Sequence, residues 1–179
     1  MAKLGSNLNS KNRIGILGGS FDPAHKGHLA ISKKAIRKFK LKKIIWAITT
    51  NNPLKKKSRT SISDRINGCK KIIKSNNLIK IRFYEDTIKS NKTIDLINYL
   101  KKNAKYEIFF LMGADNLINF HKWHKWKMIV KNCNLVVFDR HGYKKKSLNS
   151  VSFKRLKGKN LMFIKFNKVN ISSSQLRKI

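Results

Sequence analysis

Short apolar runs alternate along the chain with longer segments in which apolar residues recur every three or four positions. The short runs predict β-strands, and the periodic segments predict helices with one apolar face. Strands that alternate with helices are typical of βαβ units and of a parallel sheet. We therefore expect an α/β fold: a Rossmann-like, doubly wound parallel sheet of about six strands with flanking helices.

The predicted elements follow one another from Arg13 onward. The runs that predict strands are Arg13–Leu17, Lys43–Ile48, Leu78–Phe83, Tyr106–Met112, Asn134–Phe138 and Leu161–Phe166. The segments that predict helices are Gly27–Phe39, Asp64–Lys74, Thr93–Lys102, Trp126–Lys131 and Ser173–Arg177. Because Tyr106–Met112 is the most apolar run, we expect it to be a central strand buried on both faces.

Three segments between these elements lack a clear period. Thr49–Ser61 is polar and carries Pro53, which predicts a loop. Asn116–Trp123 predicts a loop or a short turn. Arg140–Asn160 is rich in Lys, Ser and Gly, and its weak periodicity predicts an irregular, mobile segment.

The length and composition fit one domain, with 179 residues of which 41% are hydrophobic. We expect a flexible N-terminal extension at residues 1–12 and a single domain at residues 13–179. The extension lacks the apolar stretch of a secretory signal, and no run of about 18 apolar residues predicts a membrane span. Cys69 and Cys133 stand outside metal-ligand spacings, which favours reduced thiols in a cytoplasmic protein.

The net charge of +34 comes from 42 Lys and Arg against 8 Asp and Glu. Such a charge attracts nucleic acid, anionic membranes or acidic substrates. The excess is mainly lysine, comes with many Asn and Ile, and is spread along the chain, as the codons of an AT-rich genome would produce. We therefore expect no membrane and no specific nucleic acid as partner. A non-catalytic, basic nucleic-acid-binding protein is the alternative from another class.

A glycine-rich loop joins the first predicted strand to the first predicted helix, with the sequence Gly18-Gly19-Ser20-Phe21-Asp22-Pro23-Ala24-His25-Lys26-Gly27-His28. Glycines let a backbone approach a ligand and adopt positive φ, and a helix N-terminus offers N–H groups to phosphate. The loop is neither a dinucleotide-binding nor a Walker A motif. His25 and His28 are three apart at the helix start, so they project on one face. No cysteine or carboxylate pattern completes a metal site around them, so we expect no protein-held metal.

This loop resembles the signature of the H-x-G-H nucleotidyltransferases. From Arg13 to Arg177 the chain is similar to the bacterial nicotinate-nucleotide adenylyltransferases. The resemblance implies an enzyme of NAD biosynthesis that transfers AMP from ATP to nicotinate mononucleotide, giving deamido-NAD and pyrophosphate. It implies that His25 and His28 hold the ATP phosphates and stabilise charge at the α-phosphate. The other loop residues of the implied ATP site are Gly18, Gly19, Ser20 and Phe21.

Two other segments complete the predicted phosphate site. Lys55 opens a run of three lysines that alone predicts a solvated loop, and the resemblance supports Lys55 as a phosphate ligand. Near the C-terminus, Ser172 and Gln175 fit a capping box, and a serine-rich helix N-terminus binds phosphate. The family has an Ile-Ser-Ser-x-x-x-Arg motif there that grips the triphosphate. The residues that match it are Ile171, Ser172, Ser173 and Arg177.

Three residues form the predicted acceptor site. Thr93 caps a predicted helix, and the resemblance implies that it also helps to receive the nicotinate carboxylate. Asp115 follows a predicted strand end, where it is placed to accept ribose hydroxyls or to order a metal-bound water. Trp126 is assigned to core packing, whereas Trp123 aligns with the family tryptophan that stacks on the nicotinate ring.

The implied reaction is a direct displacement in which the positive groups His25, His28, Lys55 and Arg177 are catalytic. Mg²⁺ is the expected cofactor, since it bridges the phosphates of bound ATP. Nicotinamide mononucleotide and phosphopantetheine are the alternative acceptors within the superfamily, and the sequence leaves a homo-oligomer open. Outside this set of residues, Asp64 and Arg65 stand at the start of a predicted helix, and we assign them a structural role.

Overall fold

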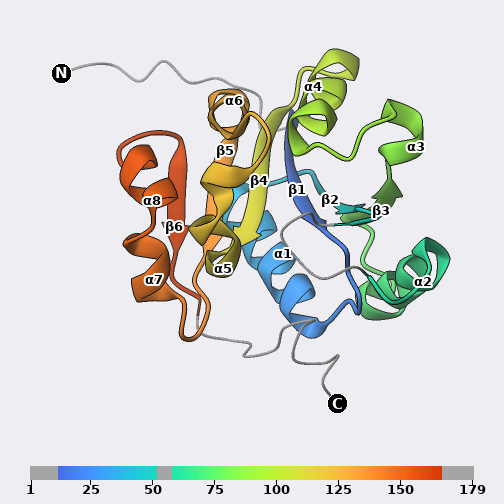
Figure 1. Cartoon of the computed structure of the whole chain (residues 1–179). Helices are drawn as coiled ribbons and strands as arrows, with labels where there is room; N and C mark the ends of the chain where they lie inside the picture. The colour runs from blue at the N-terminus through green and yellow to red at the C-terminus, as the bar shows by residue number, and fades with distance from the viewer. Residues whose placement is uncertain (1–11, 52–57, 167–179) are drawn as a thin grey trace.

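Six parallel strands form the sheet in the computed structural model, which describes residues 12–51 and 58–166. The strands are β1 (Arg13–Gly19), β2 (Lys43–Ile48), β3 (Ile79–Phe83), β4 (Glu107–Gly113), β5 (Asn134–Phe138) and β6 (Leu161–Ile164). They lie in the order β3-β2-β1-β4-β5-β6, and each neighbouring pair is parallel (Figure 1). This is the order of a doubly wound, Rossmann-like sheet, which confirms the predicted fold class.

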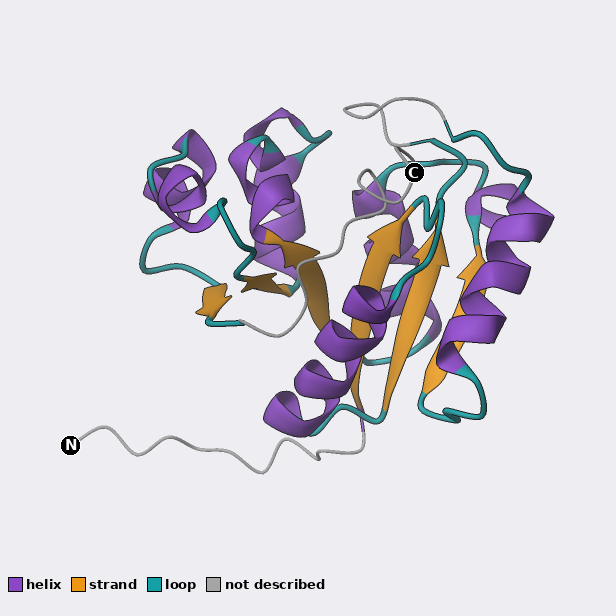
Figure 2. Cartoon of the chain, turned by 90° about the horizontal axis from the view of Figure 1, so that it is seen from below, coloured by secondary structure: helices purple, strands orange, loops and turns teal. Residues whose placement is uncertain are grey.

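Helices cover both faces of the sheet (Figure 2). They are α1 (Lys26–Phe39), α2 (Ile62–Ile73), α3 (Glu85–Ile88), α4 (Thr93–Asn103), α5 (Ala114–Ile118), α6 (Trp126–Asn132), α7 (Lys144–Leu148) and α8 (Val151–Leu156), with a short 3₁₀ helix η2 (Phe120–Lys122). Side chains of β4 alternate between two hydrophobic layers, because successive residues of a strand point to opposite faces. Phe109 and Leu111 pack with α1 and α2, whereas Ile108, Phe110 and Met112 pack with α4, α5, α6 and α8. The strand is therefore central and buried on both faces, as predicted.

The segment Arg140–Asn160 corrects one expectation, because it contains the two helices α7 and α8. Ser147, Ser150 and Ser152 are buried there, so polar residues occupy positions that a helical pattern would give to apolar ones. Each hydroxyl has a partner: Ser147 Oγ donates to Lys144 O at 2.8 Å, Ser150 Oγ accepts from Phe153 N at 3.1 Å, and Ser152 Oγ accepts from His121 N at 2.9 Å. Serines that bond to nearby backbone are tolerated inside, and they hide the helical period.

Short helices also occur where no helix was predicted. Asn116–Trp123, predicted to be a loop or a short turn, contains the last three residues of α5 and the turn η2, and α3 follows β3 in a segment without a prediction. Helices of four or five residues carry only one turn, so hydrophobic periodicity cannot reveal them. They nevertheless matter, because α3 and the end of η2 both border the main cavity.

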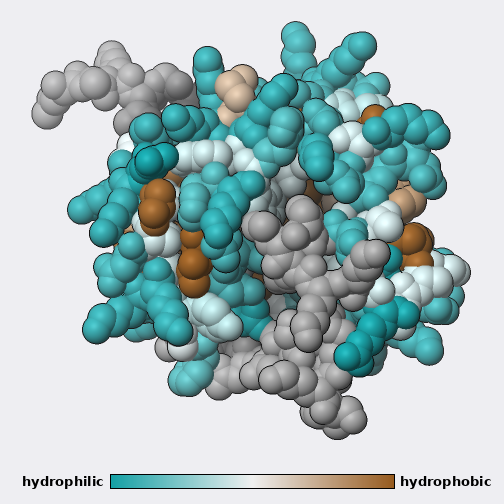
Figure 3. Space-filling model, viewed as in Figure 1, coloured by the Kyte–Doolittle hydropathy of each residue, from teal (hydrophilic) through white to brown (hydrophobic). Residues whose placement is uncertain are grey.

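The order in which the chain adds strands to the sheet changes sides between β1 and β4, although all strands are parallel. From β1 it moves outward to β2 and β3, and then it returns to β4 and continues to β5 and β6 on the other side. Ligands of such sheets bind outside the carboxyl ends of the strands at this switch point. The face in Figure 3 is mainly hydrophilic, as the charge of the chain predicts. No helix of the two described ranges is long and apolar enough to span a membrane.

Candidate active site

The two loop histidines form the N-terminal cap of α1. His25 is the N-cap residue, and its Nδ1 accepts a hydrogen bond from Gly27 N at 3.1 Å. His28 is the third residue of the helix, and its Nδ1 accepts from the backbone N–H of His25 at 3.2 Å. The two rings stack with their centroids 3.8 Å apart. The predicted pairing of the histidines on one face of the helix start is therefore confirmed.

The capping bonds decide which nitrogen of each ring carries the proton. A ring nitrogen that accepts a hydrogen bond cannot carry hydrogen, so the proton of each neutral imidazole resides on Nε2. Burial lowers the pKa of His25 from 6.5 to about 4, and the nearby Arg140 guanidinium adds to this shift. His25 in the free protein is therefore a neutral N–H donor near pH 7. This corrects the expectation that His25 supplies a positive charge.

The glycine loop differs from the expectation in its backbone. Gly18 and Gly19 are the last two residues of β1, and neither has a positive φ. Phe21 takes the left-handed conformation instead, with φ of 50°. Its ring is buried between His28 at 4.8 Å and Trp46 at 5.0 Å, measured between ring centroids. The glycines serve another purpose, since the missing side chains leave the end of β1 open to the cavity.

Arg65 braces the carboxyl ends of β1 and β2. Its guanidinium donates to Ser20 O at 3.0 Å and to Thr49 O at 2.8 Å, and its side chain is buried. Asp22 receives hydrogen bonds from Arg59 N at 2.7 Å and from Thr60 Oγ1 at 3.0 Å, which ties the loop before α2 to the loop after β1. Asp64 accepts a hydrogen bond from Ser61 Oγ at 2.7 Å, at the cap of α2. The predicted structural role of Asp64 and Arg65 agrees with these contacts.

Asp115 lies beyond the end of β4, where its carboxylate forms an ion pair with Arg140 at 2.9 Å. A Cβ atom at Gly113 would come within 2.5 Å of Asp115 Oδ1, so the glycine leaves room for this carboxylate. Arg140 was not singled out from the sequence. It stands two residues beyond β5, so the rule that identified Asp115 from the end of a strand would also have found Arg140.

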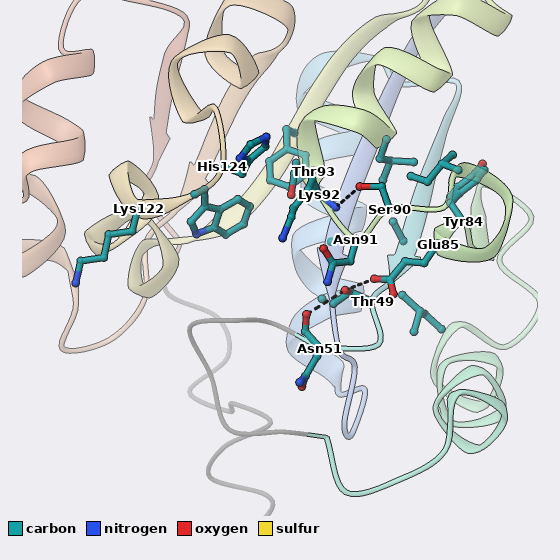
Figure 4. A pocket seen from close by; sticks show the side chains of 18 residues that line it. Thr49, Asn51, Tyr84, Glu85, Ser90, Asn91, Lys92, Thr93, Lys122 and His124 are labelled. Atoms are coloured by element: carbon teal, nitrogen blue, oxygen red, sulfur yellow. Dashed lines mark hydrogen bonds between the residues drawn. The ribbon is translucent and has the colours of Figure 1, made fainter.

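A cavity of about 400 Å³ opens at the carboxyl ends of the strands, and its lining does not include His25 or His28 (Figure 4). Gly18 and Gly19 border it at one end, and Thr93 and Trp123 border it elsewhere. Trp123 is partly buried and packs edge-on against Phe110 and Phe120. The structure thus brings together two of the three predicted acceptor residues. Asp115 is not part of this lining and lies with Arg140 instead.

Glu85 is a cavity residue that the sequence did not reveal. Its carboxylate accepts hydrogen bonds from Thr49 Oγ1, from Thr50 N at 3.1 Å and from Thr50 Oγ1 at 2.5 Å. It therefore fixes the end of β2 against α3. The short helix α3 carries no periodic signal, which explains why Glu85 was missed.

Several predicted site residues lie outside the described part of the chain. These are Lys55, Ile171, Ser172, Ser173 and Arg177, together with residues 1–11 of the expected N-terminal extension. Within the described ranges, no group of three or more His, Cys, Asp or Glu is arranged to hold a metal ion.

Comparisons with known proteins define the class. A family model described as cytidylyltransferase-like matches residues 16–179. A structure of Plasmodium falciparum nicotinic acid mononucleotide adenylyltransferase complexed with APC has a TM-score of 0.75 at 24% identity, covering 93% of this chain and 83% of that one. A second structure of that protein, complexed with NaAD, has a TM-score of 0.74 at the same identity. The chain is thus a nucleotidyltransferase of the cytidylyltransferase-like family, with the fold of these neighbours.

Curated relatives narrow the family. A protein of Pelagibacter ubique (strain HTCC1062), named "Probable nicotinate-nucleotide adenylyltransferase", is 64% identical over 180 residues, which are 100% of both chains. A relative with the same name in Agrobacterium fabrum is 37% identical over 72% of this chain and 70% of the relative. Another in Aquifex aeolicus is 32% identical over 89% of this chain and 98% of the relative. The chain belongs to the nicotinate-nucleotide adenylyltransferase family.

Proposed function

We propose that the chain transfers AMP from ATP to the phosphate of nicotinate mononucleotide. An oxygen of the acceptor phosphate attacks the α-phosphorus of ATP, the bond from that phosphorus to the bridging oxygen of the β-phosphate breaks, and pyrophosphate leaves with the bond electrons. The products are deamido-NAD and pyrophosphate. The observation that carries this proposal is the cavity at the switch point, which runs from the open end of β1 to the aromatic face of Trp123.

The histidine cap supports the phosphate end of this reaction. Because Nδ1 of His25 and of His28 accepts a backbone hydrogen bond, the proton of each neutral ring lies on Nε2, and we assign these Nε2–H groups as donors to phosphate oxygens in the bound state. The attacking phosphate is already an anion, so the reaction needs no strong base. Catalysis then consists of positioning the reactants and stabilising the charge that develops on the phosphate oxygens. A neutral donor with a fixed tautomer suits this task.

The positive charge of the phosphate end is assigned to other residues. Arg140 is close enough to His25 to lower the pKa of that histidine, and Asp115 holds the guanidinium in place. Lys55 and Arg177 are proposed as further ligands of the triphosphate, on the strength of the family motifs. The proposed ATP-binding backbone is that of Gly18, Gly19, Ser20, Phe21, Ile171, Ser172 and Ser173. Arg177→Ala is expected to raise the KM for ATP, whereas an unchanged KM and turnover would remove Arg177 from the site.

The acceptor end is assigned to Thr93 and Trp123. The indole of Trp123 offers an aromatic face to the pyridine ring, and Thr93 presents a hydroxyl and the first N–H groups of α4. Mg²⁺ is proposed to enter as MgATP. It binds proteins through few carboxylates and several substrate oxygens, which fits a site whose described residues form no metal cluster.

One assay tests the proposal. Protein, ATP and Mg²⁺ are mixed with nicotinate mononucleotide, nicotinamide mononucleotide or phosphopantetheine, and pyrophosphate is measured. We expect pyrophosphate release with the pyridine nucleotides and a higher kcat/KM for the acid. Release only with phosphopantetheine would overturn the acceptor assignment, and no release with any acceptor would overturn the activity.

A further inference from the structure

The charged side chains around the cavity differ in whether they already have a partner. The lining includes one carboxylate, that of Glu85, and two ammonium groups, those of Lys92 and Lys122. Glu85 is occupied by the hydroxyls of Thr49 and Thr50 and by the Thr50 N–H. These donors are neutral, so Glu85 keeps its negative charge, but it forms no ion pair with Lys92 or Lys122 among the described residues, and the lining holds two ammonium groups against one carboxylate.

The backbone of Lys92 is fixed at the entrance of α4. The N-cap residue of this helix is Lys92, which corrects the prediction that Thr93 caps it, and the N–H of Lys92 donates to Ser90 Oγ at 3.1 Å. Ser90 Oγ in turn donates to Asp95 Oδ2 at 2.6 Å, so the turn before the helix is tied to the first turn of the helix. This arrangement presents the side chain of Lys92 beside Thr93, at the edge of the proposed acceptor site.

The side chain of Lys92 extends into the cavity from the start of α4, whereas that of Lys122 points away from it (Figure 4). Among the interactions of the described residues, the ammonium of Lys92 has no hydrogen bond, ion pair or ring contact. A cation that is placed toward a cavity without a protein partner is available to a bound anion.

We propose that Lys92 is a specificity-determining residue that recognises the carboxylate on the pyridine ring of the acceptor. The inference rests on the proposed function, because it assumes that the pyridine nucleotide occupies this cavity. A lysine ammonium has three donors and no acceptor, so it forms charge-assisted hydrogen bonds with a carboxylate. An amide offers one neutral oxygen, and its NH₂ group finds no acceptor on the lysine. Lys92 therefore favours the acid over the amide.

The acceptor phosphate is the other anion that Lys92 could contact, and the two contacts have different consequences. Both nicotinate and nicotinamide mononucleotide carry that phosphate, so loss of a phosphate contact lowers kcat/KM for both acceptors by the same factor. Loss of a carboxylate contact lowers kcat/KM only for the acid. The ratio of the two specificity constants therefore separates the assignments.

The test compares Lys92→Met with the wild type on both acceptors. We expect kcat/KM for nicotinate mononucleotide to fall about five- to tenfold, since an exposed charge pair contributes less than a buried one, and kcat/KM for the amide to stay within about twofold. Lys92→Arg should restore most of the acid preference. An unchanged ratio in Lys92→Met, whether both constants fall together or neither changes, would overturn the inference.

Two controls keep the result specific. Lys102→Met removes the same charge from the exposed last turn of α4, so it reports any effect of net charge alone, and its acid-to-amide ratio should match the wild type. The wild-type reaction separates the two proposals. If the wild type forms no dinucleotide from either acceptor, the proposed function fails, whereas a wild type that prefers the acid with an unchanged Lys92→Met refutes only the role of Lys92.

Discussion

The two ends of the site are built on different principles. At the proposed phosphate end, His25 and His28 complete the backbone hydrogen bonding of α1, so the side chains proposed to bind phosphate also cap the helix. At the proposed acceptor end, Trp123 and Thr93 come from two separate segments that both border the cavity, and neither side chain caps a helix. We therefore expect loss of the capping groups at the first end to lower both stability and turnover, and substitutions at the second end mainly to change binding of the acceptor.

The largest expected effect comes from removing the imidazoles while keeping the cap. In His28→Gln, a glutamine at the third helical position can still accept the N-cap N–H, and in His25→Asn, asparagine is among the best N-cap residues. Both variants should lose about 100-fold in kcat because the imidazole Nε2–H is gone, and an amide whose oxygen accepts the capping bond holds its NH₂ group in a different position. Their melting temperatures should stay near that of the wild type, whereas His28→Ala should lose stability as well. Turnover within about threefold of wild type in both cap-preserving variants would contradict the assignment.

Trp123→Ala should have the next largest effect, at the other end of the site. Stacking of a base on an aromatic side chain contributes about 1–3 kcal/mol, so the KM for nicotinate mononucleotide should rise about tenfold while the KM for ATP stays constant. Steady-state kinetics with each substrate varied in turn measures this. The control is Trp126→Ala, in which a tryptophan that packs on Phe120 is removed, and it should lower stability and spare the acceptor KM. Equal rises of both KM values in Trp123→Ala would argue against a stacking role.

Gly113→Ala tests the link between Asp115 and Arg140. The added methyl group would lie 2.5 Å from Asp115 Oδ1, so the carboxylate must move and its ion pair with Arg140 is disturbed. Loss of a partly exposed pair should raise the KM for ATP about two- to fivefold. Gly68→Ala is the matched control, because a Cβ atom there meets nothing within 4 Å inside α2, and it should stabilise the protein slightly. An ATP KM equal to that of Gly68→Ala would show that the ion pair does not support ATP binding.

The smallest effect concerns the pKa of His25. The folded value of about 4 lies below the ordinary 6.5, so the unfolded chain binds this proton more readily. The contribution of neutral His25 to stability is complete above pH 6.5 and is lost as the pH falls toward 4. The free energy of unfolding of His25→Asn, measured by denaturation at several pH values, should fall less than that of the wild type between pH 6.5 and 4. A titration followed by nitrogen NMR measures the pKa of His25 directly. Arg140→Met should raise this pKa but leave it below 6.5, because burial is the larger cause of the shift. An unchanged pKa would exclude Arg140 as a contributor.

The sequence predicted the parts of the fold that have a strong hydrophobic period. The strands and the long helices α1, α2 and α4 were found close to their observed limits, because each buries one face or both. The helices α7 and α8 were missed because buried serines interrupt their apolar pattern. The helix α3 was missed for a different reason, since a single turn of helix shows no hydrophobic period.

The candidate site was predictable where chemistry is visible in residue type and spacing. The pair of His25 and His28 and the strand-end position of Asp115 followed from the sequence, and Trp123 followed from resemblance to a family. The neutral state of His25 did not, because burial and the approach of Arg140 arise only when distant segments fold together. The position of Lys92 in the cavity was hidden for a similar reason, in a chain where lysines are abundant.

The two hydrophobic layers of the sheet each contain one free thiol. Cys69 is buried in the layer of α1 and α2, and Cys133 in the layer of α4, α5, α6 and α8. Burial raises the pKa of both thiols to about 12, so almost no reactive thiolate exists while either layer is closed. The rate at which an alkylating reagent modifies each cysteine therefore reports how often the layer that contains it opens. Mass spectrometry of the peptides that contain Cys69 and Cys133 would measure the two alkylation rates, and so the opening of each layer, in one native sample.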